Sequence, residues 1–419
     1  MSDRRDQKGR ILREGESQRK NGQYMYRYTD PCGERRTIYS WTLVKTDKVP
    51  KGKRGGEALR DLETKIRMDL DDGITPNNIT VSQAFQEWMK SRPYLTVTTQ
   101  ANYKMVFDYI IEPAIGHKKL VSLRHSMIEQ FYLSLATERH YAAGTIIKVH
   151  TILRQICERA VQDNVIRNNP AANAYQKINK AGVAKQAKKK DALDTAQQNA
   201  LICYVYDNNS TRCYGNLITV LLGTGMRIGE ALGLRICDCD FDTNTISVNH
   251  TLLYKQPIGE GYKYLIAKPK TASGNRTIPM LSEVRTALLK EIAAHPDSMR
   301  TKFEVDGYKN FIFLNSKGNG LRASHIYDVL RRIREGYNCE ERAAAVAERR
   351  APVLLPPLSP HILRHTFCTR LCEQGEDIKV IQDVMGHRNS ATTLDVYADA
   401  TEERKAANFR DLEGKIKLA

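Results

Sequence analysis

The spacing of hydrophobic and polar residues changes several times along the chain. Between residues 24 and 29, tyrosines alternate with other residues, which is the period of a β-strand. Turn signals stand on either side, Asn21-Gly22 before this segment and Asp30-Pro31-Cys32-Gly33 after it. Apolar residues then recur at helical spacing from Leu59 to Leu70, and Gly73 ends the pattern. Residues 1–73 are therefore predicted to form a three-stranded sheet backed by one helix.

The next region, residues 79–172, has helical periodicity throughout. Thr80 or Ser82 can cap its first helix, whose apolar face carries Phe85, Trp88 and Met89. Residues 173–190 contain six lysines and no acidic residue, so we interpret them as a basic linker. From residue 191 helices alternate with strand-like segments, which are "TNTISVNHTLLY", "GYKYLIAKPK", "NRTIPM" and "FIFLN". The pattern predicts a multidomain chain with a small β-sheet region, an all-α region and a mainly-α region with some β-strands over residues 191–419.

The charge of the chain indicates a polyanionic partner. Lys and Arg total 65 against 48 acidic residues, a formal net charge of +17. One face of the N-terminal sheet could enter the major groove of double-stranded DNA through Arg27, Arg35 and Arg36. The linker could cross a phosphate backbone through Lys185, Lys188, Lys189 and Lys190. The alternative is a solvated sheet face and a solvated linker on a basic protein.

Other features limit the class of protein. No run of about 18 apolar residues is present, so no membrane span is expected, and the N-terminus MSDRRDQKGR has no apolar signal core. Nine irregularly spaced cysteines favour a reducing compartment, the bacterial cytoplasm, with the thiols filling the hydrophobic cores. Cys237 and Cys239 form a C-x-C without a second pair at zinc spacing, so no metal site is expected there.

The stretch "SPHILRHTFCTRLCEQGEDIKVIQDVMGHRNSATTLDVY" carries the candidate chemistry. Ser359 and Pro360 are suited to begin a helix, and His361 and Arg364 then share one face of its first turn. A helix N-terminus with these cations suits an oxyanion. A zinc stripe of His361, His365, Cys368 and Cys372 is the rival interpretation. A straight helix offers one metal about two ligands, which disfavours zinc.

Three separated segments, "GTGMRIGEAL", "HILRH" and "GHRNSATTLDVY", resemble the C-terminal motifs of the tyrosine recombinase (lambda-type integrase) family. The whole chain resembles integrases of conjugative transposons and temperate phages. That resemblance implies an arm-binding domain at 1–73, a helical core-binding domain at 79–172, and a catalytic domain of tyrosine recombinase type at 191–419. Residues 336–357 have no counterpart in the family pattern.

The resemblance also implies the roles of individual residues. The catalytic set would be Arg227, Lys270, His361, Arg364, His387 and Tyr397, with Glu230 supporting Arg227. Lys268 and Lys270 point to the same side of a predicted strand, and the Lys-Thr dipeptide favours Lys270. Two arginines suit the extra negative charge of a pentavalent phosphorus, and a phenol needs such a cationic pocket to act as nucleophile. Each residue alone could equally be structural; together they fill every position of one active site.

We therefore expect a site-specific DNA recombinase that integrates or excises a mobile genetic element. A covalent 3′-phosphotyrosine would conserve the bond energy, so neither ATP, a metal nor another cofactor is expected. Exchange of four strands implies a homotetramer on DNA, with residues 401–419 packing onto a neighbour. An excision factor and a host DNA-bending protein are further partners by family analogy. The alternatives are a relaxase similar to type IB topoisomerases and a non-catalytic DNA-binding regulator.

Overall fold

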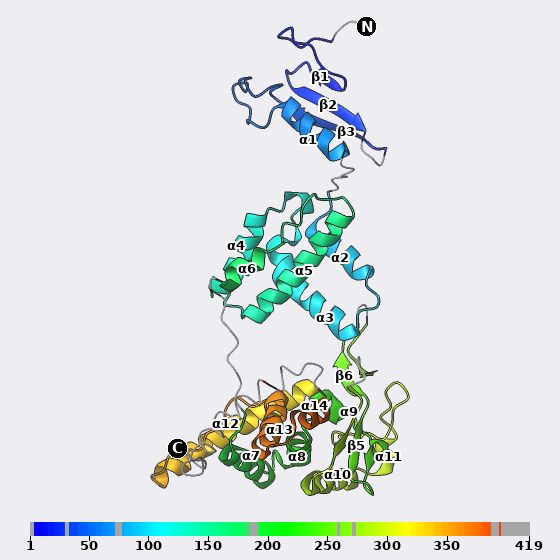
Figure 1. Cartoon of the computed structure of the whole chain (residues 1–419), viewed down its shortest axis with the longest axis vertical. Helices are drawn as coiled ribbons and strands as arrows, with labels where there is room; N and C mark the ends of the chain where they lie inside the picture. Colours follow the sequence, from blue (N-terminus) through cyan, green and yellow to red (C-terminus); the bar gives the residue numbers. More distant parts are fainter. Residues whose placement is uncertain are drawn as a thin grey trace, which may run out of the picture. The chain divides into compact units, whose positions relative to one another are not determined.

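The computed structural model describes residues 4–29, 33–71, 78–180, 182–183, 192–257, 260–269, 274–386 and 394. The chain divides into two compact units, residues 1–188 and 189–419, and each is described by itself. Figure 1 colours the elements of both units along the sequence. Among the described residues, no helix is both long enough and apolar enough to cross a membrane.

The N-terminal part of the first unit is a sheet and a helix, as predicted. Its antiparallel strands are β1 (Glu16–Gln18), β2 (Tyr24–Thr29) and β3 (Arg35–Ser40), in that spatial order. Helix α1 (Leu59–Asp71) follows (Figure 1). Tyr24 and Tyr26 are buried with Leu43 and Leu59, so alternate positions of β2 form this small core. The predicted turn at 30–32 and the helix end at Gly73 lie outside the described residues.

The strand register corrects one expectation about this sheet. Arg27 pairs with Thr37 and Thr29 pairs with Arg35, so Arg27 and Arg35 share the face opposite the core. Arg36 instead pairs with Tyr28, on the face that carries the buried tyrosines. The expectation that all three arginines lie on one face is therefore wrong for Arg36. Successive side chains of a strand point to opposite faces, so neighbours such as Arg35 and Arg36 cannot share one.

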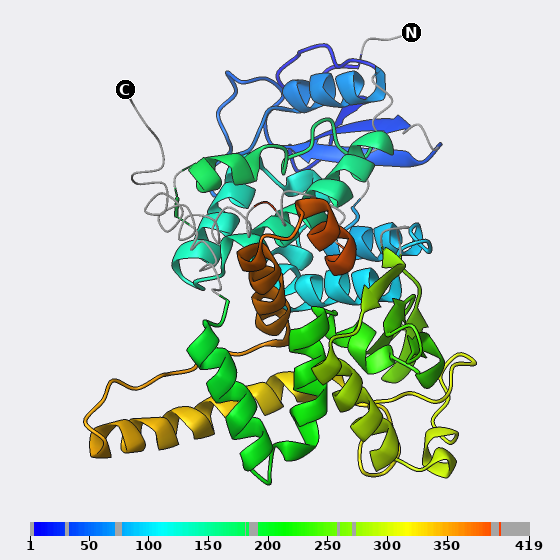
Figure 2. The same ribbon diagram turned by 60° about the horizontal axis from the view of Figure 1, so that its bottom comes forward.

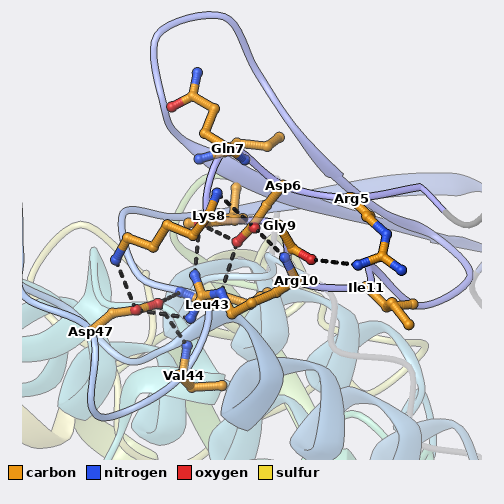
Figure 3. A network of polar contacts seen from close by, with 12 residues as sticks. Arg5, Asp6, Gln7, Lys8, Gly9, Arg10, Ile11, Leu43, Val44 and Asp47 are labelled. Atoms are coloured by element: carbon orange, nitrogen blue, oxygen red, sulfur yellow. Dashed lines mark hydrogen bonds and ion pairs between the residues drawn. The ribbon is translucent and has the colours of Figure 1, made fainter.

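A polar network fixes the N-terminal segment to the residues after β3 (Figure 3). Arg10 donates to Asp6 (Nε to Oδ2, 2.8 Å) and to Asp47 (Nη1 to Oδ1, 2.9 Å). Asp47 also accepts the backbone N–H of Leu43 at 2.9 Å. Burial acts to raise the pKa of Asp47, but the hydrogen bonds from Arg10, Leu43 and Lys8 hold it far below its usual range. The network satisfies charges that are largely removed from water.

The remainder of the first unit is helical, as predicted. Its elements are α2 (Val81–Lys90), α3 (Val97–Val106), a π-helix (Phe107–Gly116), a 3₁₀ turn (Leu120–Ser122), α4 (His125–Thr137), α5 (Ala143–Gln162) and α6 (Ala174–Lys180). Thr80 caps α2 and exchanges hydrogen bonds with Gln83 in a capping box. Trp88 and Tyr132 are fully buried in the core of these helices.

Helix α6 corrects the predicted boundary of the linker. Residues 174–180 were expected to be part of a basic linker, but they form a helix that contacts α4 and α5. Ala174, Tyr175 and Ile178 are buried in the helical core, and Lys177 forms an ion pair with Glu129 (Nζ to Oε1, 2.8 Å). The helical part of this unit therefore continues to Lys180. The linker lysines at 185 and 188–190 lie outside the described residues.

In its described residues, the second unit is mainly helical with two small sheets. The helices are α7 (Thr195–Asp207), α8 (Gly215–Thr224), α9 (Ile228–Gly233), α10 (Ser282–Ala294), α11 (Asp297–Arg300), α12 (Ala323–Ala347), α13 (Pro360–Gln374) and α14 (Ile378–Met385). The strands are β4 (Cys239–Asp240), β5 (Thr245–Val248), β6 (Thr251–Lys255), β7 (Lys263–Ala267) and β8 (Arg276–Pro279). They form an antiparallel sheet β4-β5-β8 and a hairpin β6-β7.

Helix α8 lies at the centre of this unit and contacts α7, α9, α10 and α13. Leu217, Ile218, Val220 and Leu221 of α8 are almost completely buried, which explains why its sequence is apolar on all sides. The predicted strand at "FIFLN" is wrong. Phe311, Ile312, Phe313 and Leu314 are buried, but they make only isolated bridges, from Phe311 to Arg235 and from Leu314 to Gly320.

The segment 336–357 has no counterpart in the family pattern. In the structure it is the second half of α12 and a returning stretch without regular secondary structure. Figure 2 shows α12 extending to one side of the unit and the chain then turning back along it. Asn338 exchanges hydrogen bonds with Leu355 (Nδ2 to O, 2.9 Å; N to Oδ1, 2.8 Å). Glu341 accepts two hydrogen bonds from the Arg350 guanidinium and one from the Val353 N–H. This extension is therefore held by its own polar contacts.

The cysteines fill the cores only in part. Cys157, Cys368 and Cys372 are buried, but Cys203, Cys213, Cys237 and Cys339 are exposed. The expectation that the thiols are core residues is wrong for those four. Exposed free thiols are compatible with the reducing compartment that the odd cysteine number favours.

Candidate active site

Helix α13 begins with the residues that the sequence predicts and ends at a glycine. The Ser359 hydroxyl accepts the Ile362 N–H, Pro360 occupies the first turn, and the helix ends at Gly375 in the left-handed conformation. Along the helix, the Leu193 N–H donates to Thr366 Oγ1 at 2.9 Å, and Arg370 Nη2 donates to the Leu193 carbonyl at 2.6 Å. These contacts fix α13 against the start of the second unit.

The turn between α8 and α9 places Arg227 and Glu230. Gly225 ends α8 with a φ of +61°. A Cβ at this position would lie 2.5 Å from Phe367 Cδ1 and 2.8 Å from Met385 Sδ, so the turn packs directly on α13 and α14. Arg227 is the N-cap residue of α9; its N–H donates to Glu230 Oε2 at 2.9 Å and its Nη1 donates to Glu230 Oε1 at 2.8 Å.

Three guanidinium groups converge on the C-terminal end of α14. Arg276 Nε donates to the Val384 carbonyl at 2.7 Å, Arg364 Nη2 to the Met385 carbonyl, and Arg227 Nη2 to the Gly386 carbonyl at 3.1 Å. The last carbonyls of a helix have no partner within the helix and carry partial negative charge. Three consecutive carbonyls at the C-terminal end of α14, including that of its C-cap Gly386, thus bind three cations, which come from the N-cap of α9, from β8 and from α13.

The same cluster joins the turn to α13 and β8. Arg364 Nη1 donates to the Gly225 carbonyl at 2.6 Å, across 139 positions of sequence. Arg276 binds Glu230 in a two-pronged ion pair, with Nη2 to Oε2 at 2.8 Å and Nη1 to Oε1 at 3.3 Å. Glu230 is therefore shared by Arg227 and Arg276. One carboxylate balances part of the positive charge of three arginines.

Burial and charge set the titration of this cluster. Burial acts to raise the pKa of Glu230, but the ion pair with Arg276 and the contacts with Arg227 hold it below its usual value. Burial, aided by the positive charge of Arg227, lowers the pKa of Arg364 to about 9. Arg364 thus remains a cation at neutral pH. It is 3% exposed, whereas the Arg227 side chain is 48% exposed. Arg227 is open to a ligand, and Arg364 supplies charge beneath the surface.

The structure brings together three of the residues predicted for the site, Arg227, Glu230 and Arg364. His361 lies exposed in the first turn of α13, three residues before Arg364. Lys268 is exposed just after β7, but Lys270 lies outside the described residues, so the choice between these lysines stays a prediction. His387 and Tyr397 also lie outside the described residues, although Gly386, the residue before His387, belongs to the cluster.

Arg276 is the member of this cluster that the sequence did not single out. It begins β8, and its side chain is 5% exposed. The segment "NRTIPM" predicts a strand, but alternation within a strand does not say that a guanidinium is buried. In the sheet, Arg276 pairs with the buried Val248 of β5, but this pairing joins segments that are distant in the sequence, so no local pattern indicates it.

A large cavity lies elsewhere in the second unit. Its volume is about 1020 Å³, and its lining includes Cys213, Tyr214, Glu291 and His325 but none of the three clustered arginines. Burial raises the pKa of Glu291, although the Asn216 amide donates to it at 2.9 Å. Among the residues that the structure describes, no group of three or more His, Cys, Asp or Glu side chains could hold a metal ion.

Models of protein families match most of the chain. The "Phage integrase family" matches residues 191–404. "DNA binding domain of tn916 integrase" matches residues 1–70, and "Phage integrase, N-terminal SAM-like domain" matches residues 80–136. Each of the three regions that differ in periodicity thus matches a family model of its own.

Curated relatives match over nearly the full length. The transposase from transposon Tn1545 of Streptococcus agalactiae is 34% identical over 412 residues, which are 98% of this chain and 96% of that protein. The transposase from transposon Tn916 of Enterococcus faecalis has the same identity and coverage. The solved Tn1549 transposon integrase in complex with a circular intermediate DNA is 30% identical. It has a TM-score of 0.67 and covers 80% of this chain and 99% of that one.

A solved lambda integrase dimer, 13% identical with a TM-score of 0.53, has a similar fold over 76% of this chain. The chain belongs to the phage integrase family of tyrosine recombinases. It is an enzyme of site-specific DNA recombination that serves a mobile genetic element. The predicted fold class is confirmed: a three-stranded sheet with a helix, a helical region and a mainly helical catalytic region with small sheets.

Proposed function

We propose that this recombinase cleaves DNA by attack of Tyr397 on a phosphodiester bond. The observation that carries the proposal is the convergence of Arg227 and Arg364 on the carbonyls of Gly386 and Met385 at the end of α14, directly before His387 in the sequence. Two fixed guanidinium groups in a partly buried site stabilise the extra negative charge of a pentavalent phosphorus. Glu230 keeps the Arg227 guanidinium in place.

The proposed step is balanced without a cofactor. The Tyr397 oxygen forms a bond to phosphorus and loses its proton, while the bond from phosphorus to the 5′-oxygen breaks. His361 accepts the phenolic proton, and Lys270 or Lys268 protonates the leaving 5′-oxygen. His387 donates to a phosphate oxygen. A 5′-hydroxyl of another strand reverses the step and releases Tyr397. Because the phosphotyrosine conserves one ester bond, the reaction needs neither ATP nor a metal ion.

The remaining regions bind the DNA in this proposal. The relatives Tn1549 integrase and lambda integrase were solved on DNA, and duplex DNA is the partner that the net charge of +17 suits. Residues 1–73 bind arm sites through the sheet face of Arg27 and Arg35. That face also holds Tyr39, 47% exposed, with Arg19 stacked over its ring at 5.1 Å. The helical region and residues 191–419 then bind the core site, joined by the lysines at 185 and 188–190.

The assembly follows from the reaction. Exchange of all four strands of two duplexes requires four nucleophiles, so the proposed active form is a homotetramer on DNA, and lambda integrase was solved as a tetramer on a Holliday junction. An excision factor and a host DNA-bending protein would set the direction of the reaction. The proposed compartment is the bacterial cytoplasm, which holds the DNA and keeps thiols reduced.

A suicide substrate tests the proposal. A nicked duplex that carries the end of the element is incubated with the protein in EDTA, and SDS-resistant adducts are counted. Wild-type protein should form the adduct, and Tyr397→Phe should not. Tyr327→Phe is the matched control, because Tyr327 is an exposed tyrosine of α12. An adduct that persists in Tyr397→Phe, or one that requires Mg²⁺, would contradict the mechanism. On a separate supercoiled plasmid that carries the same site, relaxation without any Holliday junction would favour a topoisomerase.

A further inference from the structure

Arg276 is almost completely enclosed, yet it carries a full charge. Its side chain is 5% exposed, and Nε, Nη1 and Nη2 each donate a hydrogen bond within the protein. Placing a guanidinium out of water is costly unless its donors are satisfied. Here two nitrogens bind Glu230 and the third binds the Val384 carbonyl. Arg276 is thus tied to its neighbours and does not present a free face to a ligand.

One side of Arg276 controls the orientation of Glu230. The Glu230 side chain is 6% exposed, and Arg276 contacts both of its oxygens. The same oxygens also bind Arg227, Oε1 through the guanidinium at 2.8 Å and Oε2 through the backbone N–H at 2.9 Å. Two-pronged binding by Arg276 fixes the plane of the carboxylate. That plane determines where the exposed Arg227 guanidinium lies.

The other side of Arg276 holds the end of α14. Its partner, the Val384 carbonyl, directly precedes the Met385 and Gly386 carbonyls that bind Arg364 and Arg227. In the proposed function the exposed Arg227 binds a DNA phosphate, so its bond to the Gly386 carbonyl is open to exchange. The bond from Arg276 to Val384 does not depend on phosphate. It therefore keeps the end of α14 beside the site.

We propose that Arg276 is a positioning residue of recombination. It holds Glu230, and through it Arg227, in register with the end of α14. The inference rests on the proposed function, because it assigns Arg227 to the scissile phosphate. Arg276 itself does not contact the reacting atoms. Loss of its contacts should displace the catalytic groups, and a misplacement of about 1 Å can cost about 100-fold in rate.

The experiment separates binding from cleavage. Full-length Arg276→Gln and Arg276→Lys are compared with wild type on the suicide duplex, with protein in excess over DNA. We expect Arg276→Gln to lower the single-turnover rate of adduct formation by roughly 100-fold, with the dissociation constant for the duplex changed less than about threefold. The rate of Arg276→Lys should lie between those of wild type and Arg276→Gln. An ammonium can pair with Glu230 but does not also reach the Val384 carbonyl in the same geometry.

Arg285→Gln is the matched control. Arg285 also joins a helix to the sheet region, with bonds to Asn244 Oδ1 at 2.9 Å and the Phe241 carbonyl at 3.3 Å, but it does not contact Glu230. Arg285→Gln should form the adduct at the wild-type rate. Equal cleavage rates for Arg276→Gln and wild type would overturn the inference. So would a rate loss in Arg276→Gln that only follows the fraction of folded protein in a thermal melt.

A double-mutant cycle keeps the inference testable if Arg276→Gln folds poorly. In the Glu230→Gln background, Arg276→Lys should cost at most a few-fold in rate, because its route to Arg227 is already lost. If the rate losses of Glu230→Gln and Arg276→Lys simply multiplied in the double variant, the inference would be contradicted. A different result would contradict the proposed function itself, namely that wild-type protein forms no adduct through Tyr397. Adduct in wild type together with an unaffected Arg276→Gln would remove only the role of Arg276.

Discussion

Arg227 and Arg364 donate to the carbonyl oxygens of adjacent residues, Arg227 to Gly386 and Arg364 to Met385. They come from two helices that lie far apart in the sequence, α9 and α13, and each is anchored by its own local cap. Two like charges close together repel, which is one reason that the pKa of Arg364 falls. The carbonyls at the end of α14 and the carboxylate of Glu230 offset this repulsion.

The first prediction concerns Arg364→Lys. A lysine carries one nitrogen and does not bridge the Gly225 and Met385 carbonyls as the guanidinium does. We expect the rate of adduct formation on the suicide duplex to fall about 100-fold or more, as for other losses of transition-state charge stabilisation. Affinity for the duplex, measured by fluorescence anisotropy, should change little, because it depends on many phosphate contacts.

The control for this substitution is Arg331→Lys. Arg331 is 62% exposed and pairs with Asp328 at 3.1 Å on the surface of α12. Its replacement should leave both the cleavage rate and the thermal transition unchanged. Cleavage by Arg364→Lys at the rate of Arg331→Lys would refute a role for Arg364 at the phosphate.

The second prediction is a pH-dependent stability effect of Glu230→Gln. The pKa of Glu230 in the folded chain lies below its ordinary value of 4.5. The ionised carboxylate therefore stabilises the fold above pH 4.5, and this contribution is lost as the pH falls through the lowered folded pKa. At pH 7, Glu230→Gln leaves Arg276 without a buried counter-charge, which should cost roughly 3 kcal/mol.

Scanning calorimetry at several pH values checks this sign. The difference in transition temperature between wild type and Glu230→Gln should be large at pH 7 and should shrink toward pH 3. Glu335→Gln serves as the control, since Glu335 is 55% exposed and pairs only with Arg334 at the surface in the described contacts. A difference that is constant from pH 7 to pH 3 would show that the charge of Glu230 does not stabilise the fold.

Local features of the fold could be predicted from the sequence because their causes are local. Ser359 and Gly375 begin and end α13, as residue type and spacing indicate. The turn of the β1-β2 hairpin likewise lies at Asn21-Gly22, as the residue types indicate. Helix α6 was missed because its lysines dominated the composition, although Ala174, Tyr175 and Ile178 lie on one helical face. The spacing of these three residues indicates the helix.

Contacts between distant segments were predictable only through the resemblance. The motifs of the family indicated that Arg227 and Arg364 meet, but spacing within one helix or strand contains no information on which carbonyls they bind. The burial of Arg276 depends on Glu230 and Val384, 46 and 108 positions away. The face of Arg36 is a different case, because the alternation of a strand already separates it from Arg35.

The third prediction concerns Gly225→Ala. Gly225 has a φ of +61°, and a methyl group there would meet Phe367 and Met385 at 2.5 and 2.8 Å. Backbone strain and overpacking should together destabilise the second unit by roughly 2 to 4 kcal/mol. The cleavage rate should fall as well, because the Gly225 carbonyl binds Arg364. Thermal denaturation and the suicide-duplex assay measure the two effects.

Gly307→Ala isolates the backbone contribution. Gly307 has a φ of +80°, but a Cβ at this position has no atom within 4 Å. Gly307→Ala should lower the stability of the fold by only about 1 kcal/mol and leave the cleavage rate unchanged. If Gly225→Ala were no more destabilising than Gly307→Ala, the close packing of the turn on α13 and α14 would be wrong.

The last prediction distinguishes the two faces of the N-terminal sheet. Arg27→Ala and Arg35→Ala remove charges from the face opposite the small core, whereas Arg36→Ala changes the face of Tyr28. Each phosphate contact that is lost should reduce the slope of log K against log salt by about 1. We expect this reduction for Arg27→Ala and Arg35→Ala in full-length protein on a duplex that carries an arm site. Arg36→Ala should keep the wild-type slope, because its side chain starts from the helix-covered side. Equal slopes for all three variants and wild type would remove this sheet face from the DNA interface.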